Sequence, residues 1–341
     1  MRTRTRILPP LALAAVLLTA TACGESGSSG NGGGGSGEGA ASASGDACAP
    51  VAGDQLVVLE DDQQLQNADN VVPAVNAAAA QANPALLETL DRVSAQLTTD
   101  ELIEMNAAVD LERQSAEDVA AAWVEQSGVT EGLEPGSGPI VVGAGNFTES
   151  TILANVYADV LGAAGFDASV REVGNRELYL PALISGSEIH VFPEYLSTVT
   201  EFLNRQANGP SAEPVASGDV QETVNALQPL AEQAGLVFGE PSEAADQNAF
   251  AVTHAFAEGL GVSTLSELAD ACGDGSLVLG GPTECPERPF CQLGLEETYG
   301  LEFAEFQEYG DTGGPLTKAA IQQGEVSIGL VFSSDGALAQ G

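Results

Sequence analysis

Basic residues are scarce in this chain of 341 residues. Lysine and arginine together number 10, against 49 aspartates and glutamates, and Lys318 is the only lysine. The net charge of −39 repels a phosphate backbone or an anionic membrane surface. Nucleic acid is therefore disfavoured as a partner. Two interpretations of the acidity stay open: solubility, for example in a salty habitat, or an electric field that attracts cations.

Histidine is rarer still, and the chain has only His190 and His254. Neither stands at metal-ligand spacing from a cysteine, which argues against a zinc site. No Ser-His-Asp spacing and no Gly-x-Ser-x-Gly elbow is evident. A hydrolase with two paired carboxylates remains open, although no pair stands out. We therefore expect no enzyme, no metal and no cofactor.

The first apolar stretch, residues 11–18, is shorter than the roughly 20 residues that a membrane-spanning helix requires. It follows three arginines and precedes Ala20-Thr21-Ala22-Cys23, an arrangement typical of a cleaved signal. These four residues resemble a bacterial lipobox. That resemblance implies that residues 1–22 are a signal peptide and that Cys23 becomes lipidated. The alternative is an ordinary secretory signal with an incidental cysteine.

Residues 23–47 read as a flexible tether, because they are almost entirely Gly, Ser, Ala and Glu. On a lipidated Cys23 this segment would hold a folded domain near the membrane surface. The residues that follow, 48–341, are numerous enough for two lobes with separate cores.

Four cysteines remain when Cys23 is set aside, and an even number favours disulfides in an oxidising compartment. Cys285 and Cys291 are close enough in the sequence for a local bridge. Cys48 and Cys272 are then left as the other possible pair.

Strands and helices alternate through the middle of the chain. Strands are expected at 140–142, 168–173 and 189–192, with helices at 150–164 and near 180–185. This alternation predicts a mostly parallel sheet covered by helices. The pattern begins again after residue 238, with strands expected at 250–252, 277–279 and 326–332. Two α/β units suggest two lobes with a cleft between them.

The segment before these units is expected to be mainly helical. A strand at 55–59 comes first, and Pro73 is expected to begin an alanine-rich helix through Ala80. Thr98 and Glu101 have the spacing of a helix N-terminal cap, and Ser115 is expected to start the last helix. Residues 128–138 read as a linker.

Several motifs are similar, in chain order, to the glycine betaine/choline-binding proteins of osmoprotectant ABC importers. They are 140–149 (IVVGAGNFTE), 175–182 (NRELYLPA), 192–198 (FPEYLST), 279–282 with Glu284 and Arg288, and 331–336 (VFSSDG). Residues 54–129 resemble the C-terminal end of the same family, so the order is rotated. This implies a circular permutation in which residues 128–138 join the usual termini. The alternative is that 54–129 form a separate helical module.

The resemblance implies an α/β, two-lobed periplasmic-binding-protein-like fold of type II, circularly permuted. Residues 48–240 would form the first lobe and 241–341 the second. The family's chain crosses the hinge twice, and the permutation would cut one crossing. We hypothesise that a Cys48–Cys272 disulfide replaces it.

The expected ligand is a quaternary ammonium compound, which has no N–H to donate and is held by aromatic faces. The resemblance implies a cage containing Tyr195, Phe250 and Phe332, and Asp69 stands where another aromatic is expected. Each position has an alternative. Phe250 and Phe332, at strand ends, are equally typical of core packing, and Asp69 is equally typical of a helix cap, whereas Tyr195 is the clearest match to the cage.

Arg288 matches the family's carboxylate-binding arginine, a residue suited to a bidentate grip, or else braces the Cys285–Cys291 loop. A lysine found in relatives is Gly145 here. The loss of that cation and the gain of Asp69 favour choline or another ligand without a carboxylate. The remaining expected contacts are Asn146, Phe147, Thr148, Thr198 and Asn248.

We therefore expect an extracytoplasmic solute-binding protein of an ABC importer, specific for glycine betaine, choline or a similar osmoprotectant. Its partners would be the importer's permease subunits and, through lipidated Cys23, the outer face of the cell membrane. We expect a monomer. The alternative is a ligand-sensing receptor domain for a different small cationic solute.

Overall fold

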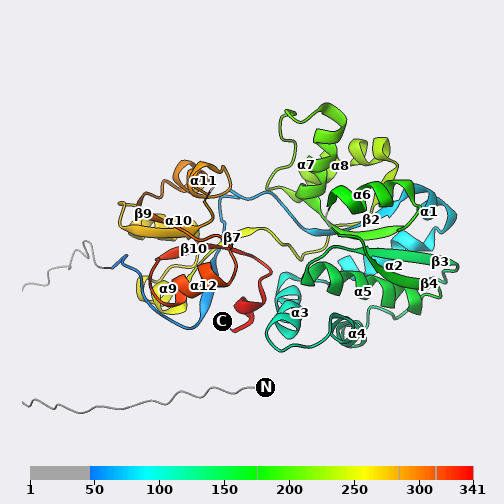
Figure 1. Ribbon diagram of the computed structural model, residues 1–341, viewed down its shortest axis with the longest axis horizontal. Helices are drawn as coiled ribbons and strands as arrows, with labels where there is room; N and C mark the ends of the chain where they lie inside the picture. The colour runs from blue at the N-terminus through cyan, green and yellow to red at the C-terminus, as the bar shows by residue number, and fades with distance from the viewer. Residues whose placement is uncertain (1–46, 175, 284, 312, 341) are drawn as a thin grey trace, which may run out of the picture. The chain divides into compact units, whose positions relative to one another are not determined.

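The computed structural model describes residues 47–174, 176–283, 285–311 and 313–340. The expected signal peptide, Cys23 and nearly all of the tether lie outside them. The described residues fold around two five-stranded sheets, and each sheet has its own hydrophobic cores (Figure 1). Within these stretches no helix has the length and apolarity needed to cross a membrane.

The first lobe is built on a mixed sheet. Its strands lie in the order β4 (Asp167–Glu172), β3 (Pro139–Ala144), β5 (Val191–Tyr195), β2 (Val71–Asn76) and β6 (Leu236–Phe238). β3 is parallel to β4 and β5, whereas β2 is antiparallel to β5 and β6. The helices of this lobe are α1 (Ala77–Ala82), α2 (Ala85–Ser94), α3 (Thr99–Asp110), α4 (Ala116–Ser127), α5 (Thr148–Ala163), α6 (Arg176–Ser185), α7 (Leu196–Asn208) and α8 (Val220–Ala234).

Local signals explain several helix starts in this lobe. The predicted cap at Thr98 is confirmed: its side chain accepts from Glu101 N, and Glu101 in turn accepts from Thr98 N. Ser115 caps α4 as predicted. The helix expected from Pro73 is wrong, because Pro73 lies inside β2 opposite Pro193. Neither proline has an N–H, so this pairing leaves no donor unsatisfied.

The second lobe has its strands in the order β1 (Leu56–Leu59), β7 (Asn248–Thr253), β10 (Ile328–Phe332), β8 (Leu277–Gly281) and β9 (Phe303–Glu308). Its helices are α9 (His254–Leu260), α10 (Leu265–Cys272), α11 (Gln292–Gly294) and α12 (Pro315–Gln322), with short turns at Cys285–Glu287 and Leu295–Tyr299. The last turn, η3 (Gly336–Gln340), follows β10 and packs on α3 of the first lobe. Buried aliphatic and aromatic side chains fill both faces of this sheet.

The lobe boundaries differ from those expected. β1 pairs antiparallel with β7, so the segment before residue 60 belongs to the second lobe and not to the first. The burial of Leu56 and Leu59 in that lobe's cores accounts for this placement.

Both expected disulfides are present, Cys48–Cys272 and Cys285–Cys291. Cys48 and Cys272 lie in the same core cluster of the second lobe. The bridge therefore fastens the N-terminal segment to α10 within one lobe, and it does not replace a crossing between lobes as we had hypothesised. That crossing is made by residues 60–70.

Three chain segments connect the lobes: residues 60–70, residues 239–247, and the residues between β10 and η3. They are hydrogen-bonded to one another where they cross. Asp246 N donates to Asp69 O at 3.2 Å, and Ser333 N donates to Gln247 O at 2.9 Å. The Ser333 hydroxyl also donates to Ala245 O at 2.9 Å. These contacts fix the residues that border the site described below.

Replacement of Cys48 and Cys272 by serine is expected to lower the free energy of unfolding by about 2–5 kcal/mol. The bridge closes a sequence separation of 224 residues and so constrains the unfolded chain strongly. The Cys285→Ser/Cys291→Ser pair is the control, because its separation of only 6 residues predicts a smaller loss, about 2 kcal/mol. Chemical denaturation of both variants measures the difference; an equal or reversed order would contradict the expectation.

Gly336→Ala is expected to destabilise the docking of η3 on α3. A Cβ at this position would lie 2.5 Å from Ala107 N, and neither backbone can yield without separating the two elements. We expect a loss of about 1–3 kcal/mol, in the range of overpacked sites. Gly310→Ala is the matched control, since a Cβ there meets nothing within 4 Å. Thermal unfolding of the two variants should separate them, and equal midpoints would refute the close approach.

Candidate functional site

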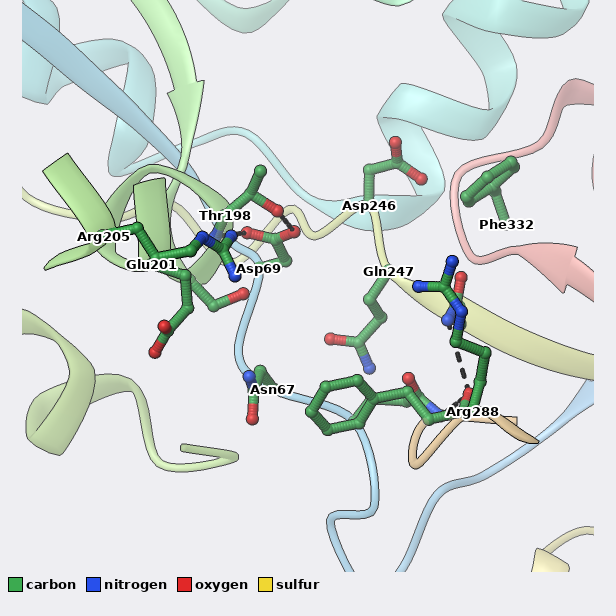
Figure 2. A pocket seen from close by; sticks show the side chains of 13 residues that line it. Asn67, Asp69, Thr198, Glu201, Arg205, Asp246, Gln247, Arg288 and Phe332 are labelled. Carbon is green, nitrogen blue, oxygen red and sulfur yellow. Dashed lines mark hydrogen bonds between the residues drawn. The ribbon is translucent and has the colours of Figure 1, made fainter. Parts of the chain in front are cut away.

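A hollow of about 440 Å³ lies where the two lobes meet (Figure 2). It is bordered by residues from α7, from the crossing segments and from the loop closed by Cys285–Cys291. The lining residues are Gln66, Asn67, Asp69, Ser197, Thr198, Glu201, Arg205, Asp246, Gln247, Asn248, Arg288, Phe290 and Phe332. We call it the first hollow.

The wall from the first lobe carries carboxylates. Asp69 accepts hydrogen bonds from both the backbone N and the hydroxyl of Thr198, at the N-terminus of α7 (Figure 2). A helix N-terminus favours a carboxylate, yet burial outweighs these contacts and raises the pKa of Asp69. Glu201 accepts from the backbone N of Val215 and of Ala216, at 2.6 and 2.8 Å. Both carboxylates are thus held by the fold.

The opposite wall carries Arg288 and two aromatic rings. Arg288 is exposed, and within the described residues its guanidinium has no recorded hydrogen bond or ion pair. Its loop is held by Gln66 Nε2 and Asn248 Nδ2, which both donate to Phe290 O, at 3.1 and 3.4 Å. Phe290 and Phe332 are 39% and 37% exposed, unusually open for phenylalanine. Figure 2 shows Arg288 and Phe332 on the opposite side of the hollow from Asp69 and Glu201.

A buried polar network lies behind these walls. Glu149, in the first turn of α5, is 5% exposed. It accepts from the hydroxyl of Tyr195 at 2.5 Å and from Asn106 Nδ2 at 2.7 Å. The same Asn106 amide donates to Ser334 O at 2.9 Å, which joins α3 to the segment after β10. The network therefore spans both lobes.

Burial changes the acidity of this network. Loss of solvation raises the pKa of Glu149, although hydrogen bonds from Ser334, Tyr195 and Asn106 oppose it. Burial, followed by the negative charge of Glu149, raises the pKa of Asp246 to about 8. Burial and the same glutamate also raise the pKa of Tyr195. Each shift favours the neutral, protonated form of its group, and the protonated form of Asp246 prevails at neutral pH.

A second hollow of about 280 Å³ borders this network. It shares Asp246 and Phe332 with the first hollow. Its lining residues are Asn106, Asp110, Leu111, Phe147, Thr148, Glu149, Asp246, Lys318, Phe332, Ser334, Asp335, Gly336 and Ala337. Lys318, its only basic residue, is paired with Asp335 at 2.5 Å.

The arrangement can bind a small charged molecule between lobes. Among the residues that the structure describes, no group of three His, Cys, Asp or Glu is placed to hold a metal ion. Residues 49–126 and 138–340 match the family model of the substrate-binding domain of ABC-type glycine betaine transport systems. The chain belongs to this family.

Membership of this family confirms the predicted α/β, two-lobed fold of the type II periplasmic binding proteins. Members of this substrate-binding family serve transport and are not enzymes. Among solved structures, the chain is similar to one described as the crystal structure of a glycine betaine/carnitine/choline ABC transporter. That match has 20% identity and a TM-score of 0.42, and covers 59% of this chain and 70% of the other.

A second similar structure is a putative peptide-binding protein, AppA, from Clostridium difficile. It has 12% identity and a TM-score of 0.28, and the match covers 59% of this chain and 47% of the other. A comparison with curated protein sequences gives no significant match.

The structure places the predicted ligand residues of this substrate-binding domain in different environments. Asp69, Thr198, Asn248, Arg288 and Phe332 line the first hollow. Phe147, Thr148 and again Phe332 line the second. Asn146 is exposed at the turn before α5 and borders neither hollow.

Two predicted cage residues lie behind the hollows. Phe250 is 1% exposed and packs in the core of the second sheet, the alternative that its strand position left open. Tyr195 is 7% exposed and lines neither hollow. Its ring centroid lies 6.3 Å from that of Phe147, and its hydroxyl holds Glu149. Tyr195 is thus in contact with lining residues of the second hollow.

Sequence reasoning missed most of the buried network. Glu149 belongs to a motif that we quoted, but nothing in the sequence marked it as buried. Asp246 stands two residues before the predicted contact Asn248, and this proximity was its only available signal. Ser334 lies two residues after Phe332, within the motif 331–336, but nothing in the motif marked it as part of a network.

Replacing Asp246 with asparagine is expected to stabilise the protein at neutral and alkaline pH. The folded-state pKa of Asp246, about 8, exceeds its value of about 4 in an unfolded chain. The stability that its proton supplies is therefore fully present below pH about 4 and is lost as pH rises through 8. We expect the free energy of unfolding of the variant to exceed that of the wild type by about 1–3 kcal/mol at pH 8 and above.

The measurement is denaturant unfolding of both proteins from pH 4 to pH 9. Glu258→Gln, an exposed carboxylate on α9, is the control and should change stability little at any pH. A constant offset between Asp246→Asn and the wild type across this range would contradict the expectation.

Proposed function

We propose that this chain is the extracytoplasmic solute receptor of an ABC importer and binds a small ammonium zwitterion in the first hollow. The observation that carries the proposal is the pairing of opposite charges across that hollow. Asp69, Glu201 and Asp246 are the acidic groups that would face an ammonium group, and the guanidinium of Arg288 would face a carboxylate. Arg205 is a second cation, on the same wall as Asp69 and Glu201. Family membership supports the transport role.

Aromatic faces support the choice of an organic cation. The rings that reach the hollows are Phe290, Phe332 and Phe147, and each is more than a third exposed. A cation over such a ring gains about 0.5–2 kcal/mol. The cage that we propose therefore contains Phe332, with Tyr195 behind it as the support of Glu149, and it omits Phe250.

Lobe closure would couple binding to transport. A ligand that touches both walls binds a closed form more tightly than an open one, and so shifts the population toward closure. The three crossing segments are the elements about which the lobes would turn. Permease subunits that recognise the closed form would then receive only loaded receptors.

Three features of the proposal concern the rest of the chain. A lipid on Cys23 would anchor the receptor to the outer face of the membrane, and the receptor would act as a monomer. A circular permutation agrees with the two matched stretches, which omit residues 127–137. These residues fall between the end of α4 and the start of β3, where we expect the family's usual termini to be joined.

Titration calorimetry of glycine betaine and choline against Arg288→Gln tests this ligand model. Loss of the guanidinium should weaken glycine betaine binding about tenfold or more, because a charge-assisted contact to the carboxylate is lost. Choline, which has no carboxylate, should lose little. Arg171→Gln, on the exposed edge strand β4, is the control and should leave both affinities unchanged. Absence of binding by any small ammonium zwitterion or by choline would refute the proposed function.

A further inference from the structure

Two buried oxygens near the second hollow lack a hydrogen-bond donor. They are Oδ1 of Asn106 and Oδ1 of Asp246, and neither has a partner in the described residues. Asn106 is 6% exposed, and its amide nitrogen is already used by Glu149 and Ser334. Exchanging the amide oxygen and nitrogen would place oxygen against two acceptors, so this orientation is the favourable one. Buried acceptors without donors cost about 1–3 kcal/mol each.

Both residues line the second hollow, and Asp246 also lines the first. Negative charge from Glu149, Asp69 and Asp335 acts on Asp246, and a hydrogen bond from the Ser334 hydroxyl opposes it. Lys318, the one lysine of the second hollow, is already paired with Asp335. Within the described residues no donor reaches the two Oδ1 atoms, and the second hollow has no unpaired cation.

A fully methylated ammonium group satisfies half of this requirement. It brings positive charge, but it has no N–H for Oδ1 of Asn106 or of Asp246. An ammonium group that keeps one or more N–H bonds brings both charge and donors. The exposed rings of Phe147 and Phe332 border the same hollow and can still pack against the remaining carbon atoms.

We infer that Asp246 and Asn106 make this receptor select ammonium ligands that carry N–H groups over fully N-methylated ones. The inference rests on the proposed function, because it concerns the ammonium end of the ligand bound there. The carboxylate end of such a zwitterion lies toward Arg288 in the first hollow, and its ammonium end points to Asp246, which the two hollows share.

Titration calorimetry of the full-length chain with glycine betaine, N,N-dimethylglycine and sarcosine tests this inference. The three compounds share one glycine skeleton and are zwitterions at pH 7, and they differ in how many N-methyl groups replace N–H bonds. We expect dimethylglycine to bind at least tenfold more tightly than glycine betaine, which corresponds to about 1.4 kcal/mol. Sarcosine should also bind more tightly than glycine betaine.

Asp246→Asn should reduce that affinity ratio to less than threefold, because the carboxyl group, which releases its proton to pair with the ammonium group, is gone. A merely structural effect would weaken all three ligands equally and leave the ratio unchanged, which would overturn the assignment of Asp246. Glu258→Gln should preserve the wild-type ratio. If Asp246→Asn does not fold, the wild-type series still decides the matter.

The outcomes separate the two proposals. Equal or tighter binding of glycine betaine by the wild type would overturn the selection of N–H groups and leave the proposed function intact. Failure of all three compounds and of choline to bind would overturn both.

Discussion

The site depends on the backbone hydrogen bonds that hold the three crossing segments together. Asp69 accepts at its carbonyl from the amide of Asp246, and Gln247 accepts from Ser333. Side chains that are far apart in the sequence are thereby set at fixed spacing along the line where the lobes meet. Any ligand that settles there touches the hinge itself, so binding free energy acts directly on the relative stability of open and closed forms.

The same arrangement explains why carboxylates are buried at this point. Asp246 has its backbone bound in the crossing, which holds its half-buried side chain between the two hollows with Oδ1 out of solvent. Glu149 is held similarly, since Tyr195 and Asn106 fix it at the start of α5. Burial penalises the ionised form of each. Raised pKa values of this kind are typical of carboxylates positioned for a ligand, and structural networks also produce them.

The sequence predicted those features that depend on local pattern. The alternation of strands and helices and the cap at Thr98 follow from spacing alone, and the structure has both. It did not predict that β1 pairs with β7 or that Pro73 occupies a strand, because strand partners are chosen by long-range packing. The predicted cage role of Phe250 was undecidable for a related reason. An aromatic residue at a strand end gives the same sequence pattern whether its ring faces a cleft or a core.

The acidity of the chain has two parts with different physical meanings. Exposed carboxylates keep their solvation and cost the fold little, so solubility is a sufficient reason for most of the 49. Solubility gains nothing from Glu149 at 5% exposure, and these buried acids lower stability unless a cation arrives. Gly145 fits this reasoning. A Cβ there would lie 2.9 Å from the ring of Phe147, so a lysine, which the resemblance implies for relatives, would displace a ring that borders the second hollow. Glycine leaves room for that ring beside the buried acids, and the positive charge is then left to be supplied from outside.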